Sequence, residues 1–141
     1  MNDRKRRMSS TVMQNQQATP GQSFGPLAGG SDWFQWYQVQ DGDTLSEIAL
    51  WWYSDGSERW WRRIWLANRK TIGEDPNRIR TNQQLKLPYL GFSYHVERGD
   101  TLWQLAEWAY DDGNSWRVIH QANPWIQDPD QIQASWWIWV P

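Results

Sequence analysis

The sequence predicts an α+β protein of two tandem units, each a strand, two helices and a strand with a two-stranded antiparallel sheet, after an extended N-terminal tail. Three observations predict this arrangement. A stretch that begins at Tyr37 returns at Tyr94, 57 residues later. Each copy opens and closes with a short alternating or aromatic run that is typical of strands. Between these runs, each copy has two stretches with apolar residues at helical spacing.

The repeat keeps its landmarks in order over both copies. The matching positions are a turn glycine, a helix leucine and alanine, an asparagine and a closing apolar-proline pair: Gly42 and Gly99, Leu45 and Leu102, Ala49 and Ala106, Asn68 and Asn123, and Leu87-Pro88 and Val140-Pro141. Chance similarity does not hold so many positions in register, so we interpret the pattern as an internal duplication. The expected boundaries are an extended or disordered arm at 1–36, a first unit at 37–88, a linker at 89–93 and a second unit at 94–141.

The first copy carries a signal for each of its elements. Residues 37–39 alternate as a strand does, and Thr44 stands three residues before Glu47, which is the capping-box spacing that begins a helix. The apolar stripe of this helix is Leu45, Ile48, Ala49 and Trp52. A second helix is expected over 58–67, with Trp61, Ile64 and Ala67 facing the core and Arg59, Arg62 and Arg63 facing outward. A loop over 69–82 and a closing strand over 85–87 complete the unit.

The second copy repeats this plan. Thr101 and Gln104 form the capping pair, and the buried stripe is Leu102, Leu105, Ala106 and Ala109. Asn114 or Ser115 is expected to cap a second helix whose core side is Trp116, Ile119 and Ala122. The closing strand is the aromatic run over 136–140.

Composition and charge limit the classes of function. The chain has 14 Trp, no Cys and a net charge of −2, so disulfides and Cys-based zinc sites are excluded. Residues 37–88 carry a net charge of +1 and residues 94–141 a net charge of −5. A nucleic-acid partner is therefore not expected, because it requires a basic stripe across the folded part. No run is long and apolar enough for a membrane span, and residues 1–17 lack the apolar core of a signal peptide, so we expect synthesis in the cytoplasm.

The arm is rich in Gln, Ser, Gly and Pro, and its basic cluster Arg4–Arg7 is either a solubilising tail or a docking segment. It ends in three aromatic residues, Trp33, Phe34 and Trp36, that are expected to pack onto the first unit.

A unit of about fifty residues that opens Tyr-x-Val-x-x-Gly-Asp-Thr-Leu and closes with an apolar-Pro pair resembles a LysM domain. The resemblance covers 37–88 and 94–141. Both copies also have Trp-x-x-Ile before the central Asn and Asp-Pro after it, which is similar to LysM units of phage-tail and contractile-injection components. The resemblance implies non-catalytic binding of N-acetylglucosamine polymers, peptidoglycan or chitin, in a shallow groove. Backbone amides would bind the acetamido groups, and apolar side chains would cover the sugar face.

The resemblance also implies which residues line the groove, between the strand-to-helix turn and the loop before the last strand. They are Gly42, Asp43, Thr44, Leu45 and Asn68 to Ile72 in the first unit, and Gly99, Asp100, Thr101, Leu102, Asn123, Trp125 and Ile126 in the second. Each type has a structural alternative, because the glycines make the turn, the threonines cap a helix and the leucines fill the core. In one place the sequence departs from the family pattern. Asn82 and Ser135 stand where the family usually has Gly.

Catalysis is not expected. His95 lies on a strand and His120 on the outer part of a helix, and neither has a Ser or Asp partner at a telling spacing. The Asp pairs at 111–112 and 128–130 match no calcium-loop pattern, so no metal site and no cofactor are expected.

The many tryptophans outside the core stripes favour protein partners, because Trp is enriched at the centres of protein interfaces. The protein-contact candidates are Trp33, Trp36, Trp51, Trp60, Trp65, Trp103, Trp108 and Trp136, some of which can instead pack between the two units. The leading hypothesis is a structural adaptor that joins inner tube, spike and baseplate proteins in a phage-tail-like contractile injection machine, made in the cytoplasm and released as part of a particle. The alternative is a module that binds peptidoglycan or chitin at the cell wall.

Overall fold

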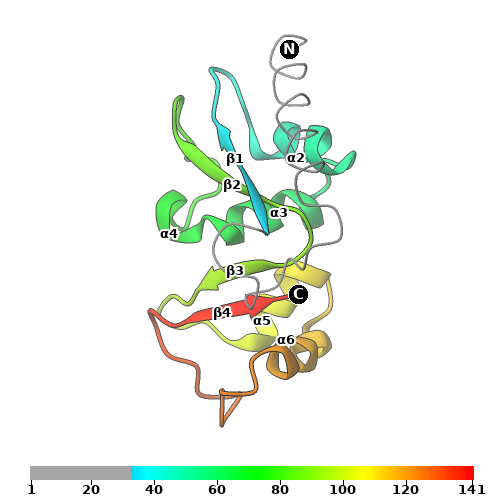
Figure 1. The fold of residues 1–141 in the computed structure, drawn as a ribbon, viewed down its shortest axis with the longest axis vertical. Coiled ribbons are helices and arrows are strands. Elements are labelled where there is room, and N and C mark those ends of the chain that lie inside the picture. The colour runs from blue at the N-terminus through cyan, green and yellow to red at the C-terminus, as the bar shows by residue number, and fades with distance from the viewer. Residues whose placement is uncertain (1–32) are drawn as a thin grey trace.

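Two β-α-α-β units follow one another in the computed structural model, which describes residues 33–141 (Figure 1). The first unit consists of β1 (Phe34–Gln38), α2 (Leu45–Tyr53), α3 (Glu58–Ala67), the single turn α4 (Arg69–Ile72) and β2 (Gln84–Pro88). The second consists of β3 (Phe92–His95), α5 (Leu102–Tyr110), the 3-10 turn η2 (Gly113–Ser115), α6 (Trp116–Ala122) and β4 (Trp137–Val140). The predicted α+β class is confirmed.

Each unit has its own two-stranded antiparallel sheet, in which the first strand pairs with the last. Tyr37 lies opposite Leu85 in β1 and β2, and Tyr94 lies opposite Ile138 in β3 and β4. These residues face the core, because side chains alternate between the two faces of a strand. Helices cover the inner face of each sheet, and the outer face carries the intervening residues.

The helices begin where the sequence predicts. The Glu47 amide donates to Oγ1 of Thr44 at 3.2 Å, and the Gln104 amide donates to Oγ1 of Thr101 at 3.0 Å. These caps satisfy amides that have no partner within the helix. The predicted stripes are buried in both first helices, except for Trp52, which is half-buried and donates its indole N–H to the Pro88 carbonyl at 2.7 Å.

Several element boundaries differ from the prediction. The first strand begins at Phe34 rather than Tyr37, because Phe34 and Trp36 extend the pairing with β2 to Pro88 and Lys86. Residues 34–36 therefore belong to the first sheet, while the part of the predicted arm before residue 33, including Arg4–Arg7, lies outside the described residues. The start of the predicted loop over 69–82 forms α4 instead. The last two residues of the predicted linker belong to β3.

The cap of the second helix in the second unit also differs. Neither Asn114 nor Ser115 caps α6 through its side chain, because both lie within η2. Asp112 takes this role one turn earlier, and its carboxylate accepts from the Asn114 amide at 3.0 Å.

The two units pack against each other through α3, which contacts α5 and β3 (Figure 1). Arg63, predicted to face outward, is buried here. Its guanidinium donates to the carbonyls of Leu90, at 2.6 Å, and Ala109, at 3.3 Å. Between α3 and α5, the indole rings of Trp65 and Trp108 meet edge to face at 5.3 Å. The buried residues of both units form one continuous hydrophobic cluster. Within residues 33–141, no helix combines the length and apolar character needed to span a membrane.

Candidate functional site

The turn between the first strand and first helix is built alike in both units. Gly42 and Gly99 have φ of 86° and 88°, a left-handed conformation that glycine adopts without strain. The carboxylate of Asp43 accepts from the Gln40 amide at 2.8 Å and from the Tyr37 hydroxyl. Asp100 accepts in the same way from Glu97 and Tyr94. Both aspartates, predicted as groove residues, therefore use their carboxylates to close this turn.

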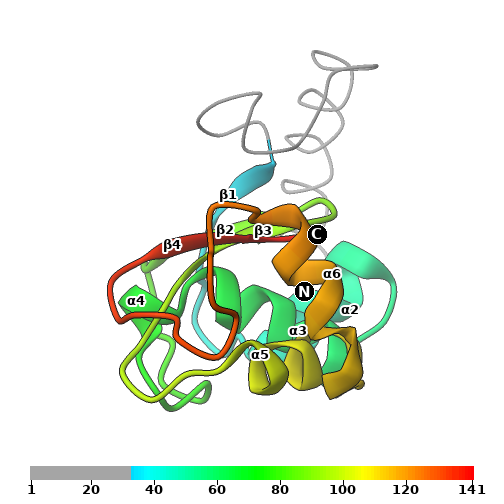
Figure 2. The same cartoon turned by 90° about the horizontal axis from the view of Figure 1, so that it is seen from below.

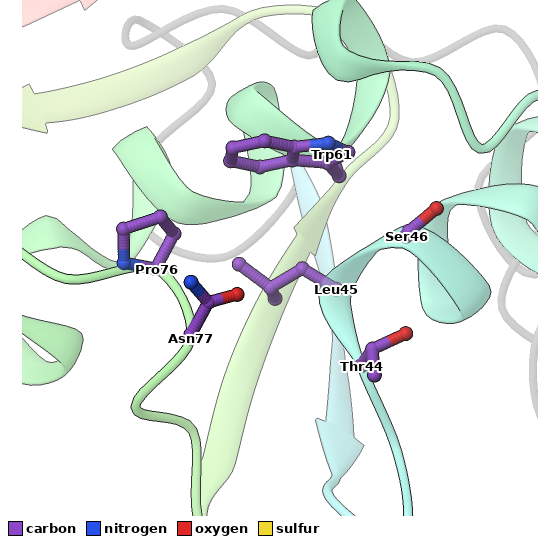
Figure 3. A pocket seen from close by; sticks show the side chains of 6 residues that line it. All are labelled: Thr44, Leu45, Ser46, Trp61, Pro76 and Asn77. Atoms are coloured by element: carbon purple, nitrogen blue, oxygen red, sulfur yellow. The ribbon is translucent and has the colours of Figure 1, made fainter.

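A pocket of about 130 Å³ lies beside the turn in the first unit (Figure 3). The start of α2 provides one wall, α3 provides the floor and the loop after α4 provides the other wall. The lining residues are Thr44, Leu45, Ser46, Trp61, Pro76 and Asn77. Figure 3 shows the Leu45 side chain between the Trp61 ring, Pro76 and Asn77. The lining is thus an apolar centre with hydroxyl and amide groups at its rim.

A tight turn holds the loop wall in place. The carboxylate of Asp75 accepts from the Asn77 amide at 2.9 Å, and its carbonyl accepts from the Arg78 amide at 3.1 Å. Such Asx turns are typical of Asp before Pro. The second unit repeats the turn, since Asp128 accepts from the amides of Asp130 and Gln131 at 3.0 Å each.

The Asn and Ile residues predicted for the second wall of the groove lie in the interior instead, while Lys70, Thr71 and Trp125 of that wall are exposed. The buried Asn68 donates to the carbonyls of Ile64, at 2.7 Å, and Lys86, at 2.8 Å, and accepts from the Lys86 amide at 2.8 Å. Asn123 makes the equivalent bonds to Ile119 and Trp139. Ile72 and Ile126 are buried as well. These residues tie the second helix to the closing strand, because a strand edge facing a helix end leaves backbone groups that need partners.

Asn82 and Ser135, which stand where the family pattern has Gly, still adopt the backbone conformation that Gly favours. Both residues have positive φ, 73° and 75°, and their amides donate to the carbonyls of Val39 and Val96. A non-glycine residue pays a modest conformational cost here, smaller for Asn than for Ser.

The second unit places different side chains at the positions equivalent to the pocket. Thr101, Leu102, Trp116 and Pro129 match their counterparts, but Trp103 replaces Ser46 and Asp130 replaces Asn77. The Trp103 side chain is 51% exposed, and its ring lies over Gly113, where a Cβ atom would stand 2.0 Å from Cε2 of the ring. Trp125, the predicted stacking platform, is also 51% exposed and meets Trp136 edge to face. The rim of the second unit is therefore more aromatic and more acidic than that of the first.

Four lining residues of the first pocket were not predicted: Ser46, Trp61, Pro76 and Asn77. Trp61 was assigned to the core, and it is half-buried, with its ring also contributing to the pocket. The repeated Asp-Pro pair was the available signal for the loop wall, since both copies place it at the same point after the central Asn.

Most of the tryptophans predicted to contact a protein partner are wholly or partly buried within the chain. Trp33 and Trp65 are buried, and Trp51, Trp60, Trp108 and Trp136 are half-buried against the core. Packing between the two units buries Trp65. The sequence pattern of a single unit does not reveal this contact. Of these candidates, Trp36 and Trp103 are exposed.

The histidines have local partners. Nδ1 of His95 lies 3.0 Å from the Glu97 carboxylate, and Nε2 of the half-buried His120 lies 2.8 Å from the Ile126 carbonyl. Within residues 33–141, no group of three or more His, Cys, Asp or Glu side chains is placed to hold a metal ion.

Comparison with known proteins identifies one of the two units. Residues 94–141 match the family model of the LysM domain. The chain is 36% identical over 102 residues to Esterase MT1326 and Esterase Rv1288, from two strains of Mycobacterium tuberculosis. The match covers 72% of this chain and 21% of each esterase, so the chain spans about a fifth of the length of these relatives.

Among solved structures, the chain is similar to the Bacillus megaterium QM B1551 spore cortex-lytic enzyme SleL, with 27% identity and a TM-score of 0.32 over 80% of this chain and 23% of that chain. The family match is confined to the second unit, residues 94–141, which the model of the LysM domain covers from β3 to the end of the chain.

Proposed function

We propose that the protein is a non-catalytic binding module of two tandem LysM units that holds N-acetylglucosamine polymers, with peptidoglycan as the first choice and chitin as the second. The observation that carries this proposal is the pocket between the start of α2 and the Pro76-Asn77 loop. It lies where the family resemblance puts the turn wall of the glycan groove, and two of the predicted groove residues, Thr44 and Leu45, line it.

The hydrogen-bond framework supports extending the family from the second unit to the first. The turn carboxylate, the helix cap and the central asparagine make equivalent bonds in both units, at Asp43 and Asp100, Thr44 and Thr101, and Asn68 and Asn123. The 102-residue match to the two esterases is also longer than either unit and so includes parts of both.

The chemistry of the pocket suits a neutral acetamido sugar. An N-acetyl group has an apolar methyl, which the Leu45 and Trp61 side chains can cover, and an amide that needs a donor and an acceptor. Thr44 and Asn77 supply both at the rim. The sugar gains affinity only if its amide keeps hydrogen-bond partners when its methyl group is buried. An unpaired buried amide costs more free energy than burial of the methyl group contributes.

Sedimentation of the full chain with insoluble peptidoglycan tests the proposal, with cellulose as a polymer that lacks acetamido groups. We expect saturable binding to peptidoglycan and none to cellulose. Asn77→Arg, which fills the first pocket, should weaken binding, while Gln121→Arg on the exposed side of α6 adds the same charge and should not. Equal sedimentation of wild type and Asn77→Arg would remove the first pocket from the binding surface.

A second candidate function is the structural adaptor of a phage-tail-like contractile machine, acting in the cytoplasm where the machine assembles. Its support is the exposure of large apolar side chains away from the pocket, among them Leu50, Val118 and Trp103. Density-gradient sedimentation of a tagged full chain tests it. Wild type would migrate with large particles, Trp103→Ser would remain at the top as a folded monomer, and slow migration of wild type itself would count against the adaptor.

A further inference from the structure

The outer faces of the two sheets adjoin and form one aromatic and cationic surface. Figure 2 shows the strands of both sheets gathered on one side of the molecule, with α3 and α5 on the other. In register, Trp36 faces Lys86 across the first sheet, and His95 faces Trp137 across the second. We call this surface, with Lys70 of α4 at its edge, the joint sheet face.

The Lys86 ammonium connects the two sheets. Its Nζ lies 5.9 Å from the ring centroids of both Trp36 in the first unit and Trp137 in the second. Lys70 Nζ lies 5.7 Å from the Trp137 ring. Trp36 and Trp137 are nevertheless 49% and 47% exposed, so about half of each indole remains open to a ligand.

The two lysines have no counter-charge in the described part of the chain, where neither forms an ion pair. The carboxylate on this face, that of Glu97, lies against His95 instead. Partial burial and the nearby Lys70 hold the pKa of Lys86 below its ordinary value. A partly desolvated ammonium group beside a second cation is unfavourable, and an incoming anion would relieve that cost.

The fold itself does not require the tryptophans. Because the copies are in register, the counterpart of Trp36 in the second unit is Ser93, and the counterpart of Trp137 in the first unit is Gln84. The same backbone position therefore accepts a small polar residue in one copy and an indole in the other. A half-exposed indole at a position that the fold leaves free favours a role in binding.

We propose that the joint sheet face binds an anionic sugar polymer, with pyranose rings over Trp36 and Trp137 and their carboxylate or phosphate groups at Lys86 and Lys70. Flat rings that carry negative charge match both features of the face. An apolar protein helix would cover the indoles but leave both ammonium groups desolvated without a partner. The face shares no residue with the pocket of the first unit.

Isothermal titration of the full chain with polygalacturonate tests the proposal. Fully methyl-esterified polygalacturonate is the matched control, because it has the same backbone without the charge. We expect binding of the free acid that weakens with added salt, and binding of the ester that is about tenfold weaker or absent. A phosphomannan titration then distinguishes phosphate from carboxylate as the preferred anion.

Substituting the residue that the other unit has at the equivalent position should keep the fold. Trp36→Ser and Trp137→Gln should each weaken polygalacturonate binding about tenfold, and Lys86→Gln should remove most of its salt dependence. Trp103→Ser removes an equally exposed indole elsewhere and should change nothing. Equal binding of the acid and the ester would overturn the proposal, as would wild-type affinity in both tryptophan variants. If those variants instead abolish self-association and leave polyanion binding intact, the face is a protein interface and the proposal is wrong.

The binding of anionic polymers at the joint sheet face and the binding of peptidoglycan at the pocket can be tested separately. Asn77→Arg should reduce peptidoglycan sedimentation without changing polygalacturonate affinity, and Trp137→Gln should leave the pocket of the first unit unchanged.

Discussion

Replacing Arg63 by methionine should loosen the packing of the two units. The Arg63 side chain lies in α3 and reaches both the linker and the last turn of α5 through its bonds to the Leu90 and Ala109 carbonyls. Its guanidinium also lies over the rings of Phe92, at 5.3 Å, and Tyr110, at 6.0 Å. A cation at the end of α5 is favourable, because the carboxyl end of a helix carries a partial negative charge.

The size of the effect follows from what the variant leaves behind. Methionine has similar length and fills most of the space, so the cavity term is small. The Leu90 and Ala109 carbonyls lose their donor, and each stranded polar group costs about 1–3 kcal/mol. The variant also removes an unfavourable contribution, because the wild-type chain buries the charge of Arg63. Burial lowers the pKa of Arg63 for this reason. We expect a net loss of about 2–4 kcal/mol in the free energy of unfolding.

Urea unfolding followed by tryptophan fluorescence measures this loss. Arg63→Met should lower the midpoint and broaden the transition, because uncoupled units unfold separately. Arg62→Met is the matched control. Arg62 is the neighbouring arginine, its ion pairs to Glu58 and Asp111 are partly exposed, and its loss should cost less than about 1 kcal/mol. The reasoning is refuted if Arg63→Met unfolds within about 0.5 kcal/mol of wild type, or if Arg62→Met costs as much.

Two further predictions concern the framework. Asn68→Leu should destabilise the chain by about 2–4 kcal/mol, because it breaks three hydrogen bonds of a buried residue, two of them to Lys86. Thermal unfolding measures this loss, and Asn77→Leu, at an exposed asparagine, should change stability by less than about 0.5 kcal/mol. Stability should also fall as pH rises above about 10. Burial raises the pKa of Tyr53 and of Tyr94 in the folded chain, so the unfolded chain loses these protons at lower pH. Deprotonation therefore stabilises the unfolded state relative to the folded state. Urea midpoints between pH 8 and 11 test this, and a constant or rising midpoint would contradict it.

Local signals were sufficient where a unit is self-contained. The helix at 58–67 follows from its apolar stripe and the helix before it from the Thr44 cap, and both lie where predicted. Arg63 shows the limit. Helical periodicity placed it outward, which is correct for an isolated unit, but the second unit packs on that side of α3. The sequence pattern of one repeat contains no information about the surface that the other repeat covers.

The pocket shows a second limit of the same kind. The turn wall was predictable because Gly42, Asp43 and Thr44 are consecutive and each has a recognisable turn or cap chemistry. The loop wall depends on where residues 73–83 return in space, and this is set by tertiary packing. Asn68 was placed in the groove because the LysM resemblance assigns that position to it, yet its side chain holds the closing strand against the second helix.

The duplication itself separates residues that the fold requires from residues that it leaves free. Positions that make the same hydrogen bonds in both units, such as Asn68 and Asn123, carry the framework. Positions on the same backbone that differ in chemistry are under no such constraint. Asn77 against Asp130 changes the charge of a groove rim, so an anionic stretch of glycan would be repelled from the second rim but not from the first. A ligand that spans both units should therefore bind with a fixed polarity, its neutral acetamido stretch at the second unit and its anionic stretch at the first, and exchanging Asn77 and Asp130 should reverse that preference in cross-linking to an end-labelled glycan.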